Sequence, residues 1–297
     1  MNQKVQYNDP GKATVNGIEI VYDTFGERSA TPILLVMGLG AQMIAWDEAF
    51  CQKLAALGFW VIRFDNRDVG LSTRFDDAGI PDIPAMFQAQ MQGKDLESPY
   101  TLRDMADDAV GLLDAIGVES AHVVGVSMGG MIVQEMVIHH AQRIRTMTSI
   151  MSSTAPVLPR PDAMAVLLKP PPTGRANHID DSVESTKVLN GPAYPIDEDR
   201  VRERAGLAFD RGLSPAGTAR QLAAILASGS RKEALQSVTV PTLVIHGDAD
   251  PLVPVEGGID TAESIPGAEL LIFQGMGHDL PPVIWSQVMD AIVKHAA

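Results

Sequence analysis

Residues 121–140 read AHVVGVSMGGMIVQEMVIHH, a strand pattern that runs through a glycine-flanked serine into a helix pattern. The first five residues are a short apolar run, typical of a strand buried on both faces. From Ser127 to His140 the apolar residues follow a helical spacing. Small residues at Gly125 and Gly129 allow a sharp turn between the two elements. Such a turn places the serine at a helix N-terminus, where free backbone N–H groups face a developing oxyanion.

Strand and helix patterns alternate on both sides of this stretch. Apolar runs typical of strands stand at 32–37, 59–64, 144–150, 242–246 and 269–273, and helix patterns at 46–57, 101–116, 255–264 and 281–295. Repeated strand–helix–strand units imply a mostly parallel sheet with helices on both faces. The alternating residues 13–22, centred on Asn16-Gly17, predict a hairpin that adds antiparallel strands at one edge. We therefore expect an α/β fold with an eight-stranded sheet.

One region interrupts the alternation. Between Pro156 and Pro195, 40 residues hold 8 of the 20 prolines of the chain and show no strand pattern. We expect an irregular segment there, and irregular segments of this length in a compact domain are usually functional. The alternative is that this segment is a surface loop without a function.

Helix patterns return after that segment, and Ser214-Pro215 has the residues of an N-cap and a first helical position. The whole insertion resembles a lid placed between two strands of the sheet. We predict a helical cap of residues 152–236, inserted into a core domain that comprises residues 1–151 and 237–297.

The charge of the chain is acidic, with 23 Lys plus Arg against 37 Asp plus Glu and a formal net charge of −14. This balance argues against a nucleic acid or an anionic membrane as partner, because phosphate surfaces attract clustered basic residues. No apolar run is long enough to span a membrane, and the polar residues 1–10 predict no secretory signal. The single cysteine, Cys51, allows no internal disulfide. We expect a cytoplasmic monomer or homodimer.

A serine becomes a strong nucleophile only beside a base, and that base needs an acid to orient it. Among the seven histidines, His278 alone follows the last strand pattern in a glycine-containing turn, from which its imidazole can reach over the serine. The acid is expected at the end of an earlier strand. The segment 246–251, HGDADP, offers Asp248 and Asp250 there.

Three motifs together resemble the α/β-hydrolase fold family: GVSMG at 125–129, GDADPLVP at 247–254, and Gly277-His278. They stand in the family's order Ser…Asp…His, and the likeness extends over nearly the whole chain. The resemblance implies Ser127 as nucleophile and His278 as base. It also implies Asp250 as the orienting acid, because the family's aspartate in G-x-x-D falls on that position.

The same resemblance implies an oxyanion hole formed by the backbone N–H groups of Leu39 and Met128. Most members of the family carry His-Gly before this loop, whereas this chain has Met37-Gly38 and so lacks a residue that commonly orders the loop. With FDNRDVGLS at 64–72, this variant resembles the esterase branch around aclacinomycin methylesterase. We interpret the Asp- and Arg-containing part of that segment as a structural turn.

These features predict a serine hydrolase that needs no cofactor or metal and cleaves carboxylic esters with a hydrophobic acyl or alcohol part through an acyl-enzyme on Ser127. Its partner is then a small hydrophobic ester. We expect pocket residues at Met37, Gly38, Met43 and Met131, although methionines also fill irregular gaps in protein cores. Carbon–carbon bond hydrolases, perhydrolases and acyltransferases use the same triad and stay open as alternatives. So does a ligand receptor that keeps the triad.

Overall fold

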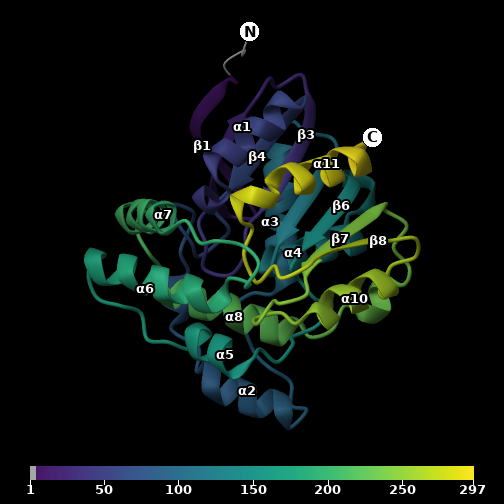
Figure 1. The fold of residues 1–297 in the computed structure, drawn as a ribbon. Coiled ribbons are helices and arrows are strands. Elements are labelled where there is room, and N and C mark those ends of the chain that lie inside the picture. The colour runs from purple at the N-terminus through teal and green to yellow at the C-terminus, as the bar shows by residue number, and fades with distance from the viewer. Residues whose placement is uncertain (1–4) are drawn as a thin grey trace.

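The computed structural model describes residues 5–297, which form an eight-stranded sheet in the order β1-β2-β4-β3-β5-β6-β7-β8 (Figure 1). The strands are β1 (Tyr7–Val15), β2 (Ile18–Phe25), β3 (Thr31–Val36), β4 (Phe59–Phe64), β5 (Ala121–Val126), β6 (Ile144–Ile150), β7 (Thr242–Gly247) and β8 (Glu269–Phe273). The pairs β1–β2 and β2–β4 are antiparallel, and every other neighbouring pair is parallel. The predicted mostly parallel sheet is confirmed.

The predicted hairpin forms the antiparallel edge of the sheet. Asn16 and Gly17 both have positive φ angles, 48° and 77°, and Val15 pairs with Ile18 across the turn. Two successive left-handed residues match the right-handed twist of the flanking strands, which is why Asn-Gly favours this turn.

Helices cover both faces of the sheet because alternate side chains of a strand point to opposite sides. In β3, Ile33 and Leu35 belong to an apolar cluster with α1 and α11, whereas Leu34 and Val36 belong to a second cluster with α3 and α4. The helices outside the β6–β7 connection are α1 (Glu48–Ala56), α2 (Ile83–Met91), α3 (Leu102–Ala115), α4 (Met128–His139), α10 (Val255–Ser264) and α11 (Trp285–Ala296).

The helix boundaries largely follow the expected capping residues. Thr101 and Asp104 form a complete capping box at the start of α3, with Thr101 Oγ1 accepting the Asp104 N–H and Asp104 accepting the Thr101 N–H. Two helices begin a few residues later than predicted. Asp47 caps α1 from the residue before Glu48. Pro282 keeps the preceding Pro281 extended, with ψ 141°, and the turn Pro282–Ile284 then precedes α11.

Five helices connect β6 to β7, namely α5 (Pro161–Leu167), α6 (Arg175–Leu189), α7 (Glu198–Arg211), α8 (Pro215–Ser228) and α9 (Lys232–Leu235). The expectation of an irregular segment over 156–195 is wrong, because α5 and α6 occupy much of it. Pro161 stands at the first turn of α5, where a missing N–H costs nothing, and the prolines 170–172 lie between the two helices. The prolines therefore mark helix boundaries here.

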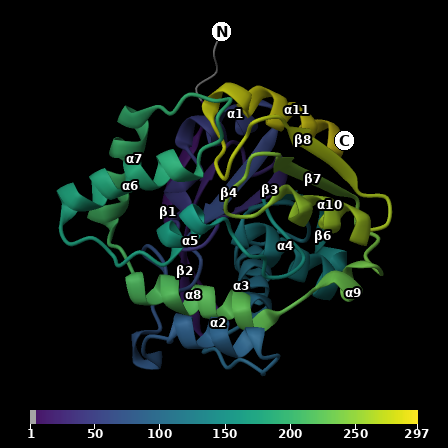
Figure 2. The ribbon, with the colours of Figure 1, turned by 60° about the horizontal axis from the view of Figure 1, so that its bottom comes forward.

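The helices α5 to α8 gather on the side of the molecule away from β8 (Figures 1 and 2). Helix α8 begins at Pro215 with Ser214 as its N-cap, as predicted. Helix α2, for which the sequence showed no clear pattern, packs beside α8. The bounds of the predicted cap and core stay a prediction, and residues 1–4 of that core lie outside the described residues. Within 5–297, no helix is both long and apolar enough to cross a membrane.

Candidate active site

Ser127 stands in a strained turn between β5 and α4. Its backbone angles are φ 56° and ψ −122°, a region that residues with a side chain rarely adopt. A Cβ on Gly125 would collide with the carbonyl oxygen of Gly129, and a Cβ on Gly129 would collide with that of Val36. Both positions therefore require glycine. The strained turn presents the serine hydroxyl to a cavity instead of burying it in the sheet.

The structure brings together the three residues that the motifs single out. His278 Nε2 lies 2.9 Å from Ser127 Oγ, and His278 Nδ1 lies 2.7 Å from Asp250 Oδ2. The second carboxylate oxygen of Asp250 accepts the N–H groups of Leu252 and Val253 at 2.8 and 2.9 Å. These bonds hold the carboxylate in one orientation, with Oδ2 directed at the imidazole.

Asp248 and His246, the other two polar residues near the end of β7, make different contacts. Asp248 Oδ1 accepts the N–H of Gly275 at 2.5 Å and so fixes the turn after β8. His246 is fully buried, and its Nε2 lies 2.8 Å from the carbonyl oxygen of Val253. Burial lowers the pKa of His246, which keeps this ring neutral behind Asp250. Of the two candidate acids, Asp250 is the one that faces His278.

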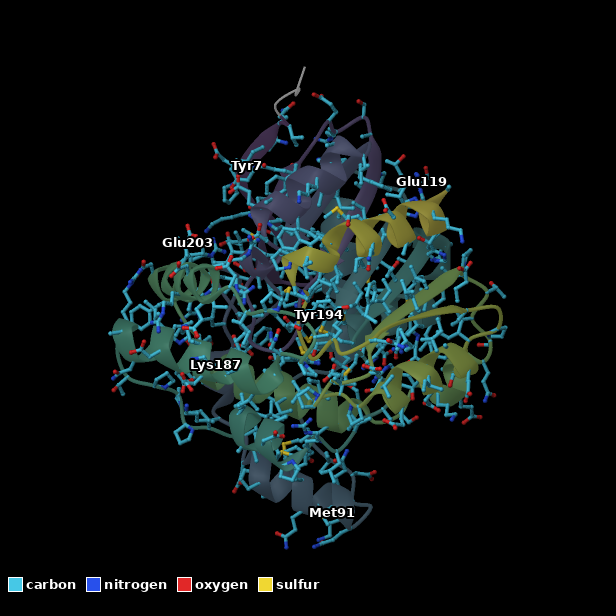
Figure 3. All side chains as sticks on the ribbon, viewed as in Figure 1. Tyr7, Met91, Glu119, Lys187, Tyr194 and Glu203 are labelled. Carbon is cyan, nitrogen blue, oxygen red and sulfur yellow. The ribbon has the colours of Figure 1, made fainter. Side chains whose placement is uncertain are left out.

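The loop that carries His278 is bonded to the end of α6. The His278 N–H donates to the carbonyl oxygen of Leu189 at 2.8 Å, and the Ala193 N–H donates to that of Gly275 at 3.2 Å. Tyr194, in the same linker after α6, lies near the middle of the view in Figure 3 and packs against the apolar cluster under α11. The insertion between β6 and β7 therefore positions the histidine. Because these hydrogen bonds join backbone atoms, no residue type in the sequence indicates them.

The loop after β3 passes directly beside the serine. A Cβ on Gly38 would lie 3.1 Å from Ser127 Cβ. The backbone N–H groups of Leu39 and Met128 donate to no acceptor within the described residues 5–297. Free donors at these two positions are what an oxyanion hole needs.

Two amide side chains hold this loop in place of the histidine that most members of the family carry. Asn66 Nδ2 donates to the carbonyl oxygen of Met37 at 3.0 Å. Gln221, on α8, accepts the Gly40 N–H at 2.8 Å and donates to the carbonyl oxygen of Arg67 at 2.8 Å. Because Gln221 lies 181 residues from Gly40 along the chain, no local pattern could have indicated this contact.

Replacing Gln221 with methionine is expected to lower kcat about tenfold with little change in KM. The Gly40 N–H then loses its acceptor. A loss of about 1.4 kcal/mol of transition-state stabilisation with this hydrogen bond corresponds to a tenfold lower rate. Steady-state kinetics on p-nitrophenyl butyrate measure the effect. Gln236→Met, at an exposed position, is the matched control and should leave kcat unchanged. A lower melting temperature with an unchanged kcat would show that Gln221 only stabilises the fold.

Ser127 and His278 line a cavity of about 580 Å³ that also borders α6 and α7. Of the four predicted pocket residues, Met37 and Gly38 line it. Met43 and Met131 do not: both are buried, and Met131 packs in the apolar cluster with α3 and α4. These two methionines fill the interior, which is the alternative that the sequence left open.

The cavity wall also holds charged residues that the sequence analysis did not single out. They are Asp47, Asp197, Arg200 and Arg204, together with Asp279, the residue after His278. Arg200 forms an ion pair with Asp47, and its guanidinium lies 4.6 Å from the ring centre of Trp285. The position of Asp279 directly after His278 could have indicated it as a site residue. Nothing in the local sequence indicates Arg204, because only the packing of α7 brings it to the cavity.

Asp279 makes the stability of the protein depend on pH. Burial raises the pKa of its carboxyl from 3.8 to about 6, against the opposing effects of His278 and Arg204, and the nearby Asp250 adds to the rise. A pKa raised by folding means that ionising the group costs stability as the pH rises from about 4 through 6.

We expect Asp279→Asn to raise the free energy of unfolding by about 2 kcal/mol at pH 8 and not at pH 4, allowing for partial solvent screening of the charge. Urea unfolding at the two pH values measures the difference. Asp290→Asn, on the exposed side of α11, is the control. An equal gain at both pH values would contradict the assignment of the effect to ionisation.

Residues 31–282 match the family model described as alpha/beta hydrolase fold. Rhodomycin D methylesterase DnrP of Streptomyces peucetius is 30% identical over 91% of this chain and 92% of its own length. Rhodomycin D methylesterase DauP of Streptomyces sp. (strain C5) is 29% identical over 95% of this chain and 96% of its own.

Solved structures agree on the architecture. The esterase EaEST from Exiguobacterium antarcticum superposes with a TM-score of 0.75, covering 97% of this chain and 99% of its own, at 18% identity. At that identity the likeness shows the fold alone. The predicted fold and its resemblance to the esterase branch are confirmed.

Proposed function

The chain belongs to the alpha/beta hydrolase family, and on this basis we propose that it is a serine esterase. The observation that carries the proposal is the hydrogen-bonded series from Ser127 through His278 to Asp250, with the serine and histidine at the wall of a cavity. A nucleophile, a base in contact with it and an acid that orients the base are the parts that acyl transfer requires. Two methylesterases among the relatives support an ester as the substrate.

In the first half of the reaction, Ser127 Oγ attacks the ester carbonyl carbon while His278 Nε2 takes its proton. The Asp250 carboxylate stabilises the imidazolium that forms. The carbonyl oxygen becomes an oxyanion and accepts hydrogen bonds from the backbone N–H groups of Leu39 and Met128. No acceptor among residues 5–297 occupies these two donors, so they need no rearrangement before the reaction.

In the second half, the imidazolium of His278 gives its proton to the departing alcohol oxygen, and the bond between that oxygen and the acyl carbon breaks. An acyl-enzyme on Ser127 remains. A water molecule then gives a proton to His278 and attacks the acyl carbon, and the same proton returns to Ser127 Oγ as the acid leaves.

The substrate class follows from the cavity. A volume of about 580 Å³ lies in the range of sites for organic molecules of moderate size. Apolar side chains such as Leu189, Val201 and Trp285 form most of its wall, which suits a hydrophobic ester. The methylesterases among the relatives support methanol as the leaving alcohol, so that the acyl part of the substrate fills the cavity.

Residues 152–236 are proposed to act as a cap that covers the bound ester. The cavity is lined by α6 and α7 from this segment and by Gly38, Ser127 and His278 from the rest of the chain. The cytoplasmic location and the monomeric or homodimeric state remain predictions. Cell fractionation and light scattering on the purified protein test them.

A substrate panel tests the esterase proposal. The purified protein is offered methyl esters of increasing acyl size and, in parallel, a diketone of similar size. We expect turnover of the esters and none of the diketone. Turnover of the diketone alone would instead support carbon–carbon bond hydrolysis. A single turnover followed by arrest would support a receptor that retains the triad.

A further inference from the structure

Arg204, on α7, lines the cavity without a partner for its charge. No carboxylate oxygen lies within 4.0 Å of its guanidinium, and no acceptor within hydrogen-bond distance, among residues 5–297. The other three arginines of α7 are paired: Arg200 with Asp47, Arg202 with Asp180, and Arg211 with Asp65. Among the arginines of α7, Arg204 is thus the one without a partner in the described part of the chain.

The surroundings of Arg204 disfavour its positive charge. Burial lowers the pKa of Arg204, and the neighbouring Arg200 lowers it further. Arg204 is half-buried and partly exposed to the cavity, so an acceptor that enters the cavity can reach its guanidinium and pair with its charge. A perturbed charge at the wall of a cleft is therefore a candidate for ligand binding.

The nearest carboxyl groups do not satisfy Arg204. Asp47 is engaged by Arg200. Asp279 acts on Arg204 through its charge but stays more than 4.0 Å away, and its Oδ1 has no hydrogen-bond partner within the described part of the chain. Burial raises the pKa of Asp279 to about 6.

We propose that Arg204 binds a carboxylate at the far end of the acyl part, so that the substrate is a half-ester: a carboxylic ester that carries a second, free carboxylate. The planar guanidinium can hold both oxygens of a carboxylate in parallel hydrogen bonds, which a neutral ester end does not offer. Arg204 and Ser127 line the same cavity, and its apolar side chains take the hydrocarbon spacer. The inference rests on the proposed esterase function, since it assigns the acyl part to this cavity.

The test compares monomethyl suberate with methyl octanoate, two methyl esters of equal acyl length that differ in the terminal carboxylate. We expect the wild-type protein to have a kcat/KM at least tenfold higher for monomethyl suberate. Arg204→Gln should reduce the ratio of the two kcat/KM values at least tenfold, and Arg204→Lys should keep part of it, because a point charge remains. Arg202→Gln, on the exposed side of the same helix, should keep the wild-type ratio.

A ratio that is the same in wild type and Arg204→Gln would overturn the carboxylate site while leaving the esterase function intact. So would an equal loss on both esters accompanied by a lower melting temperature, since that marks a structural role.

If the protein hydrolyses neither ester, calorimetric titration of the wild-type protein with suberate tests the carboxylate site separately from the esterase function. If neither ester is hydrolysed but suberate binds and Arg204→Gln weakens binding at least tenfold, the carboxylate site stands and the esterase function fails. If Arg204→Gln binds suberate as tightly as wild type, the site fails.

Discussion

Ser127→Ala is expected to lower kcat for p-nitrophenyl butyrate by about 10⁵-fold, since the acyl-enzyme can no longer form. The residual rate would come from binding and the free N–H donors at Leu39 and Met128 alone. The melting temperature should change little, because the serine side chain lines the cavity and, within the described residues, its hydroxyl is hydrogen-bonded to His278 alone. Alanine also keeps the Cβ that the strained turn already accommodates.

The control for this prediction is Ser237→Ala, an exposed serine whose hydroxyl donates only to a backbone carbonyl. It should retain the wild-type kcat. Turnover by Ser127→Ala above a hundredth of the wild-type rate, with mass spectrometry showing no contaminating esterase, would exclude Ser127 as the nucleophile.

Asp250→Asn is expected to lower kcat about 10⁴-fold by reversing the histidine tautomer. The oxygen of the new amide keeps the two N–H groups of Leu252 and Val253, so its NH₂ group faces His278 Nδ1. Nδ1 must then accept a hydrogen bond, which leaves the ring proton on Nε2. A protonated Nε2 cannot take the proton of Ser127, although the geometry is retained.

Asp248→Asn serves as the matched control, since it makes the same chemical change two residues away. Its side-chain oxygen can still accept the Gly275 N–H, and it does not face His278. We expect less than a tenfold loss in kcat. Equal losses in the two variants would mean that Asp250 acts through the fold of the loop and does not orient the histidine.

The sheet was predictable because its signals are local. Apolar runs of five to seven residues become strands wherever both faces are covered, and nine of the predicted strand and helix ranges agree with the structure at both ends to within one residue, among them β4 and β6. The elbow was predictable because backbone collisions at Gly125 and Gly129 exclude any side chain there. Where local signals were mixed, as in the proline-rich stretch that contains α5 and α6, the prediction was wrong.

The candidate site also has one part that the sequence predicts and another that depends on the tertiary structure. The sequence by itself determined the order of Ser127, Asp250 and His278 and the elbow that presents the serine, since motif and backbone sterics act over a few residues. Tertiary structure alone decided that Gln221 bonds to the loop beside the serine, and that Arg204 faces the cavity without a partner. At these two positions, α8 and α7 lie beside residues that are distant along the chain. Such contacts depend on how helices pack in space, and no local residue pattern encodes that packing.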